Sequence, residues 1–351
     1  MHRWLRTILS SVFVLLMLAS GHLLMVAVNA AEVAVTRGAR SGGLEARLFT
    51  DQSLTAELDG AVMRSRSPEH RALLVAARER VARGEPLVLH TMPVTSFLVG
   101  ATLGLTALGL VLLWLTSRLQ SDAAQTIVGV FAGNLLWTGS VEYGLTIASR
   151  ALGIGKTIGV VDGTLTAIFG EYVLLKHSWG ALVLVMAYLL FLESSRCPAF
   201  LFFRERAPLM RGSLVTGRID NRGPRTAFQY ATTVWGFYLL LLWAYDEQLF
   251  GVHGWFTTSV LLLSLAGTVF TVWRLHQHTG WGAAIRYAIG AMVVAWTPIE
   301  VLGKWGVFRE PWLLLHPTTV TLFFGGLALG TWGLVRAQRR ARELELPTAA
   351  A

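Results

Sequence analysis

Charged residues are scarce in this chain of 351 residues, because Asp, Glu, Lys and Arg together make up only 15% of it. Apolar residues account for 54%, and the mean hydropathy is +0.54, which exceeds what a soluble domain can bury. This composition excludes an ordinary soluble enzyme. It predicts an all-α polytopic membrane protein, with room for about eight transmembrane helices of ~20 residues each.

Cysteine and lysine are nearly absent. Cys197 is the single cysteine, so an intrachain disulfide and a thiolate metal cluster are both excluded. The net charge of +9 comes almost entirely from arginine, and the arginines gather in particular loops rather than along one face. That distribution indicates membrane topology and not nucleic-acid binding. We therefore expect membrane lipids as partners, together with a membrane-protein partner or a second copy of the chain.

The N-terminal third contains one apolar run and one polar segment. Residues 1–30 are interpreted as a first transmembrane helix or as a signal peptide, because Val28-Asn29-Ala30 resembles a cleavage site. The run of ~24 apolar residues favours the helix. Residues 31–92 are predicted to be a small extracytoplasmic segment containing a helix at Pro68–Arg83, with Ser67 as its cap.

The remaining apolar runs follow one another closely. Residues 93–192 are predicted to hold transmembrane helices 2–4, and residues 228–336 helices 5–8. Between them lies an Arg-rich loop, 193–227, and residues 337–351 form a basic tail. The positive-inside rule places this loop and both termini in the cytoplasm of a cell inner membrane. The expected spans within these ranges are 94–115, 124–147, 172–192, 228–244, 255–273, 283–302 and 313–335.

A short motif recurs in the two halves of the chain. Residues 171–177 read EYVLLKH and residues 310–316 read EPWLLLH, and each copy follows an apolar run that carries Trp-Thr and then Glu. An alignment of Trp137-Thr138 with Trp296-Thr297 needs a one-residue gap to bring Glu142 onto Glu300. The pattern predicts a 4+4 internal duplication, with the halves related by an axis along the membrane normal.

The repeated acids and histidines predict a metal site near the extracytoplasmic face. Four carboxylates and two imidazoles match the ligand set of a dinuclear iron or manganese centre in a helical bundle. A separation of six residues places Glu and His about 120° apart around a helix. For both side chains to reach one ion, each helix would have to bend where it begins, at Gly170 and at Pro311. The predicted metal ligands are Glu142, Glu171, His177, Glu300, Glu310 and His316.

Three functions stay open on this pattern. The first is a metal-dependent, di-iron-like redox enzyme or subunit acting on a small or lipid-borne substrate, with one or two iron or manganese ions. The second is a proton- or ion-coupled transporter that uses the same carboxylates. The third is a structural or assembly subunit, in which the acids cap helices and the histidines anchor the membrane interface.

Several other features are predicted to be structural. Glycine pairs four residues apart predict close helix packing. His276 and His278 are expected to be solvated, Gly155-Lys156-Thr157 to be a plain loop, and Asp246 with Glu247 to be an exposed helix end. The glycine pairs are Gly100/Gly104, Gly129/Gly133 and Gly326/Gly330.

Overall fold

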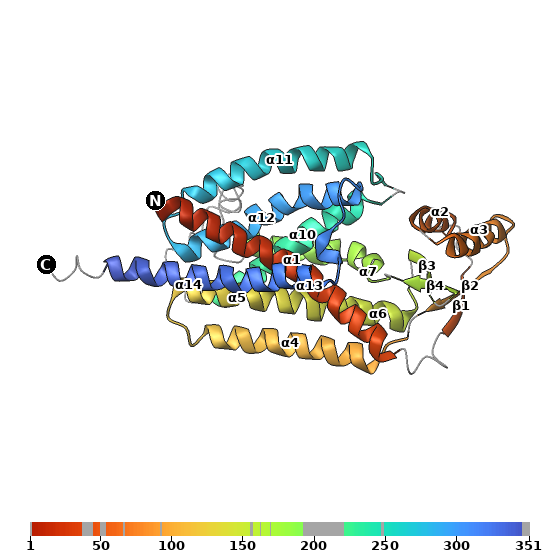
Figure 1. Cartoon of the computed structure of the whole chain (residues 1–351), viewed down its shortest axis with the longest axis horizontal. Coiled ribbons are helices and arrows are strands. Elements are labelled where there is room, and N and C mark those ends of the chain that lie inside the picture. The colour runs from red at the N-terminus through yellow and green to blue at the C-terminus, as the bar shows by residue number, and fades with distance from the viewer. Residues whose placement is uncertain are drawn as a thin grey trace.

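The computed structural model describes residues 2–36, 45–49, 54–65, 67–91, 93–154, 157–161, 163–168, 170–191, 221–246 and 249–345. Most of the predicted loop 193–227, including Cys197, and the end of the predicted tail lie outside these residues. The described chain forms a bundle of helices with a small α/β unit at one end, which we call the cap (Figure 1). Both chain termini lie at the opposite end of the bundle (Figure 1).

Each predicted span coincides with a helix or with consecutive helices. Five helices of the described chain are long and apolar enough to cross a membrane, at Arg3–Val35, Ser96–Thr116, Trp255–His276, Trp281–Lys304 and Pro317–Arg340. Their length and composition are those of a multi-pass membrane protein. The bundle consists of α1 (His2–Thr36), α4 (Ser96–Thr116), α5 (Asp122–Leu136), η2 (Trp137–Tyr143), α6 (Gly144–Leu152), α7 (Glu171–His177), α8 (Trp179–Phe191), α10 (Arg222–Ala244), α11 (Trp255–His276), α12 (Trp281–Lys304), η4 (Pro311–Leu313), α13 (Pro317–Val320), η5 (Thr321–Gly325) and α14 (Gly326–Glu345).

The packing of the bundle is reciprocal between the two halves of the chain. Helices α5 and α12 pack against each other, with α4 against α5 and α11 against α12. The first helix of each half packs on the other half, since α10 contacts α5 and α1 contacts α12 (Figure 1). Side chains of α1 such as Phe13 and Met17 are fully buried with Ile285 and Ile289 of α12. Helix α1 is therefore an integral part of the core.

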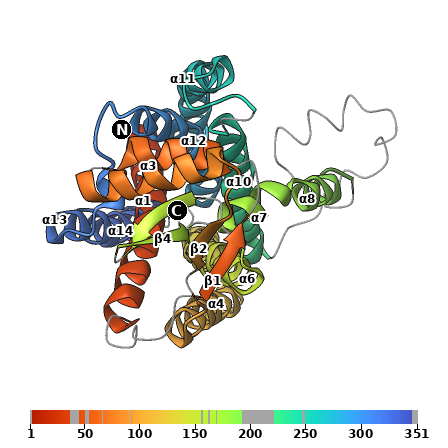
Figure 2. The same cartoon turned by 90° about the vertical axis from the view of Figure 1, so that its right-hand side faces the viewer.

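Two irregular turns interrupt the helices. Residues Trp137–Tyr143 form a π-helical turn between α5 and α6, and residues Thr321–Gly325 form another before α14. A π-helical turn holds one residue more than an α-helical turn. The predicted span 172–192 is also broken, at Ser178, into α7 and α8, and α8 lies at the outside of the bundle against α10 (Figure 2).

Glycines set the close approach of α5 to α10. A Cβ atom on Gly129 would lie 2.5 Å from the Gly223 carbonyl oxygen, and one on Gly133 would lie 2.8 Å from the Ala227 carbonyl oxygen. The packing prediction is thus confirmed for this pair. It is wrong for Gly100 and Gly104, beside which a Cβ would meet open space, while Gly326 and Gly330 make ordinary contacts with Leu16 of α1.

The cap contains two helices and a four-stranded sheet (Figures 1 and 2). Helix α3 begins at Pro68 and its N-cap Ser67 accepts a hydrogen bond from the His70 amide, so the predicted helix is confirmed. Leu58, Leu74 and Leu89 form part of the cap's own apolar core. The elements are β1 (Glu45–Phe49), α2 (Leu54–Arg64), α3 (Pro68–Ala82), β2 (Leu87–Thr91), β3 (Thr157–Val161) and β4 (Thr164–Ile168).

The sheet joins two distant parts of the chain. Its order is β1-β2-β4-β3, in which β1 and β2 are antiparallel, β3 and β4 form a hairpin, and β2 pairs in parallel with β4. The predicted segment 31–92 therefore does not stand alone, and the all-α description omits this sheet. Thr157 was predicted to lie in a loop but begins β3, while Gly155 and Lys156 lie outside the described residues.

The end of the bundle opposite the cap is held by polar contacts. The His276 ring stacks on Trp4 at 4.2 Å between centroids, and the His278 ring lies 4.7 Å from that of Tyr287. Arg6 donates to the His278 carbonyl oxygen. Both histidines were predicted to be solvated; they are instead partly buried against neighbouring helices, because α1 packs beside the loop that carries them.

Candidate functional site

A cavity of about 700 Å³ lies between α1, α6, α7 and α10, toward the cap end of the bundle. This volume is in the range of small-molecule binding sites. Most of its lining is apolar, and the polar side chains come from four helices and the π-helical turn. Among them are His22, Asn29 and Glu32 of α1, Glu142 of η2, Arg150 of α6, Glu171 and Tyr172 of α7, and Tyr238 of α10.

Glu142 is presented by the π-helical turn. Residues 137–143 contain one residue more than the equivalent α-helical turn, so Glu142 follows Trp137 by five positions. The Trp137 indole lies near the Glu142 carboxyl group, and His22 and Glu171 line the same cavity as Glu142. Three parts of the chain therefore meet at Glu142.

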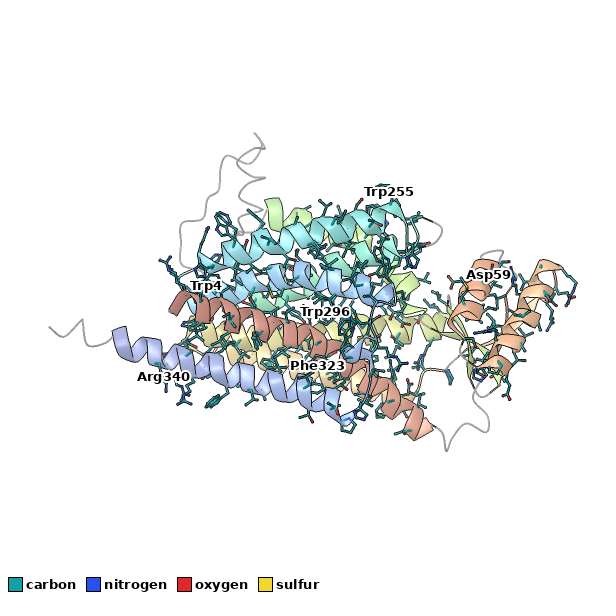
Figure 3. The ribbon with its side chains drawn as sticks, turned by 45° about the horizontal axis from the view of Figure 1, so that its top comes forward. Trp4, Asp59, Trp255, Trp296, Phe323 and Arg340 are labelled. Atoms are coloured by element: carbon teal, nitrogen blue, oxygen red, sulfur yellow. The ribbon has the colours of Figure 1, made fainter. Side chains whose placement is uncertain are left out.

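Glu300 has a matching environment in the second half. It follows Trp296 by four positions in the continuous helix α12. His22, Glu310 and Lys304 lie near its carboxyl group. The Trp296 indole nitrogen lies close to Glu300 but is buried without a partner in hydrogen-bonding geometry among the described residues. Figure 3 places Trp296 within the bundle, between the cap and the end that carries Trp4 and Arg340.

His22 is the group common to the two halves. Its ring is 5.8 Å from that of Trp296, its Nδ1 bonds to the Leu18 carbonyl oxygen at 3.0 Å, and it lies near both Glu142 and Glu300. The sequence interpretation did not select this residue. The signal was present, since His22 is an ionisable residue inside the first apolar run.

The two predicted histidine ligands lie elsewhere. His177 is exposed, and its Nδ1 bonds to the Val173 carbonyl oxygen of the same helix at 2.7 Å. His316 is also exposed and caps α13 by accepting from the Thr318 amide. The two copies of the repeated motif differ in conformation. Residues Glu171–His177 form an α-helix, whereas residues 310–316 contain a single 3₁₀ turn and extended backbone.

Glu171 and Glu310 are nearer to the site. Glu171 lines the cavity together with Glu142. Glu310 packs on Gly303, where an added Cβ atom would lie 2.7 Å from Glu310 Cγ. The Glu310 side chain therefore lies near Glu300, three residues before Gly303 in the same helix. Among the described side chains, no group of three His, Cys, Asp or Glu has the arrangement of a metal site. Metal binding by these residues stays a prediction.

A buried ion pair closes one side of the cavity. Glu32, at the cap end of α1, is almost fully buried and accepts from Arg150 of α6 and from Thr95 Oγ1. Thr95 is the N-cap of α4 and follows strand β2 by a few residues, so the pair connects the bundle to the cap. A second ion pair joins Lys176 of α7 to Asp246. Asp246 was predicted to be an exposed helix end, but α7 covers it; Glu247 lies outside the described residues.

No family model, curated protein or solved structure matches the chain.

Proposed function

We propose that this chain is a proton-coupled membrane transporter in which Glu142 and Glu300 take up and release protons on either side of His22. The observation that carries the proposal is the position of His22. It lines a cavity inside the bundle together with Glu142, and its ring lies 5.8 Å from that of Trp296, one helical turn before Glu300. Ionisable residues within membrane-spanning helices are costly and are typical of proton relays and substrate sites.

A two-fold arrangement of four helices plus four underlies this proposal. The one-residue difference between the Trp137–Glu142 and Trp296–Glu300 spacings falls on the π-helical turn, which accommodates one extra residue. Thr138 and Thr297 are both almost fully buried. The reciprocal packing of α10 on α5 and of α1 on α12 is the pattern that two related halves would produce.

Such a transporter crosses the membrane eight times, with the cap outside the cell membrane and both termini in the cytoplasm. Support comes from the start of α1 and the end of α14, which lie at the end opposite the cap (Figure 1), and from arginines near that end such as Arg3, Arg118 and Arg340. The proposal also requires that α1 is retained, because His22 and Glu32 belong to it.

The chemistry follows from the surroundings of the acids. No Lys or Arg forms an ion pair with Glu142 or Glu171 among the described side chains, and a buried carboxylate is stabilised by a bound proton or cation. His22 can pass a proton between the two acids, because one nitrogen of an imidazole ring can accept a proton while the other donates one. A solute that enters the cavity and binds Glu142 would displace its proton and so couple the two movements.

Infrared difference spectroscopy of the reconstituted protein tests the proposal. Changing the pH should alter the C=O stretch of protonated buried carboxyl groups, and Glu142→Gln and Glu300→Gln should each remove part of that change. Glu85→Gln, an exposed acid of the cap, is the control and should leave the change intact. Identical spectra for all four proteins would refute proton uptake at these residues.

The same preparations discriminate the metal-dependent enzyme from the transporter. Near-stoichiometric iron or manganese in the wild type that is lost in the Glu142→Gln/Glu300→Gln double variant would refute the transporter proposal and support the predicted metal site. Under our proposal, the metal content of the purified protein is low and is the same in wild type and in the double variant.

A further inference from the structure

We infer that the cavity binds an organic cation, with its charged group at Glu142 and Glu171 and its apolar body along α1 and α6. This inference deepens the proposed function and rests on it, because the cation and the proton would compete for the same carboxylates. It is carried by three features of the cavity, which are its charge, its aromatic wall and its size.

The charge of the cavity is negative where the polar groups converge. Glu142 and Glu171 both line the space. The guanidinium group of the lining, Arg150, donates to both carboxylate oxygens of Glu32 and is therefore occupied by that acid. After this pairing, two carboxylates of the lining are left to balance the charge of a ligand.

An aromatic wall stands beside these acids. The ring of Tyr238 lies 6.3 Å from Trp137 in an edge-to-face arrangement and 6.1 Å from Tyr172. Tyr172 and Tyr238 both line the cavity. Aromatic faces attract cations and are typical of sites for ammonium ligands. Carboxylates next to tyrosines thus favour a cation over an anion or a neutral sugar.

The size and the rest of the lining indicate an organic ligand. A volume of about 700 Å³ is far larger than a single inorganic ion requires. Apolar side chains make up the wall away from the acids, among them Met25, Val26, Val33 and Leu145. A ligand that fills this space gains from burying an apolar body, which an inorganic cation lacks.

Two probes of the same shape and opposite charge test the inference. Isothermal titration of the detergent-solubilised full chain with tetraphenylphosphonium and with tetraphenylborate, each against a detergent blank, compares a cation with its anionic counterpart. We expect tetraphenylphosphonium to bind at least about tenfold more tightly, and the Glu142→Gln/Glu171→Gln double variant to lose about tenfold in affinity for it. Glu85→Gln should bind it as the wild type does.

The wild-type comparison decides the inference even if the double variant does not fold. Equal binding of both probes would overturn it and would describe an apolar lipid pocket, while leaving proton uptake by the acids unaffected. Release of protons into a weak buffer on tetraphenylphosphonium binding supports both proposals. Selective cation binding without proton release supports the ligand class and refutes the proton coupling.

Discussion

Arg150 donates hydrogen bonds to both carboxylate oxygens of Glu32, at nitrogen–oxygen distances of 2.7 Å and 3.1 Å. The Glu32 side chain is only 3% exposed, so its charge depends on this partner. The bond ties the end of α1 to α6 at the level where the cap begins. Its loss should therefore affect the whole bundle and not one loop.

Substitution Arg150→Met should destabilise the protein by about 3–5 kcal/mol, because it removes the guanidinium group that donates to both oxygens of a buried carboxylate. Thermal unfolding in detergent measures the effect. Arg118→Met is the control, since Arg118 lies over the Trp114 ring on the surface and its loss should cost no more than about 0.5 kcal/mol. The double variant Glu32→Gln/Arg150→Met should regain part of the lost stability; a double variant no more stable than Arg150→Met would contradict the pairing.

Two glycines with the same sequence context should respond in opposite ways to alanine. Gly129→Ala would place a methyl group 2.5 Å from the Gly223 carbonyl oxygen, so α5 and α10 must separate, at a cost of about 1–3 kcal/mol. Gly100→Ala meets open space and should be neutral or stabilising by less than about 1 kcal/mol. Unfolding temperatures of the two variants check this, and equal values would count against the described α5–α10 contact.

The π-helical turn predicts an unusual tolerance to deletion. Removal of Ser140, which is exposed within the turn, should convert it to an α-helical turn and leave the flanking helices in register. Removal of Val130, which is fully buried in α5, should rotate all following residues of the helix by about 100°. Folded protein recovered in detergent should approach the wild-type amount for the first deletion and fall severely for the second.

The loop between α11 and α12 should make stability depend on pH. The pKa of His278 is lowered by its burial and then by the charges of Arg274, Arg6 and Arg286. The folded protein thus binds this proton less readily than the unfolded chain, whose histidines titrate near about 6.5. The contribution of His278 to stability should be complete above that pH and should decline as the pH falls from it toward the lower folded pKa.

His278→Gln should remove this part of the pH dependence. Unfolding temperatures measured between neutral and mildly acidic pH would show a smaller decline for the variant than for the wild type. His70→Gln in the cap is the control and should retain the wild-type decline. A variant curve that falls as steeply as the wild type would refute the assignment to His278.

The helices were predictable because long apolar runs carry their own signal. The helix at Pro68 was equally visible, since its cap and its proline act locally. The sheet was not, because β2 and β4 are separated in the sequence by helices α4, α5 and α6, and their pairing leaves no local pattern. Residues 157–168 consequently looked like a loop between two membrane spans.

The candidate site was predictable in part for the same reason. Glu142 and Glu300 were selected through a repeated motif, and the structure places both next to one imidazole. The imidazole is His22 and not His177 or His316, because helix α1 packs across the bundle onto α12, which no spacing within the motif could indicate. Arg150 lies beyond the predicted span 124–147, and its buried pair with Glu32 of α1 leaves no signal in the local sequence.

The parallel pairing of β2 with β4 has a consequence for the order of biosynthesis. A ribosome delivers β1, α2, α3 and β2 long before β4, and the chain between them contains α4, α5 and α6. In the proposed topology, the cap cannot complete its sheet until this stretch has crossed the bilayer and returned to the same side. A finished cap is therefore possible only after these helices have been inserted in the correct orientation, so the sheet serves as a structural check on the topology of the nascent chain.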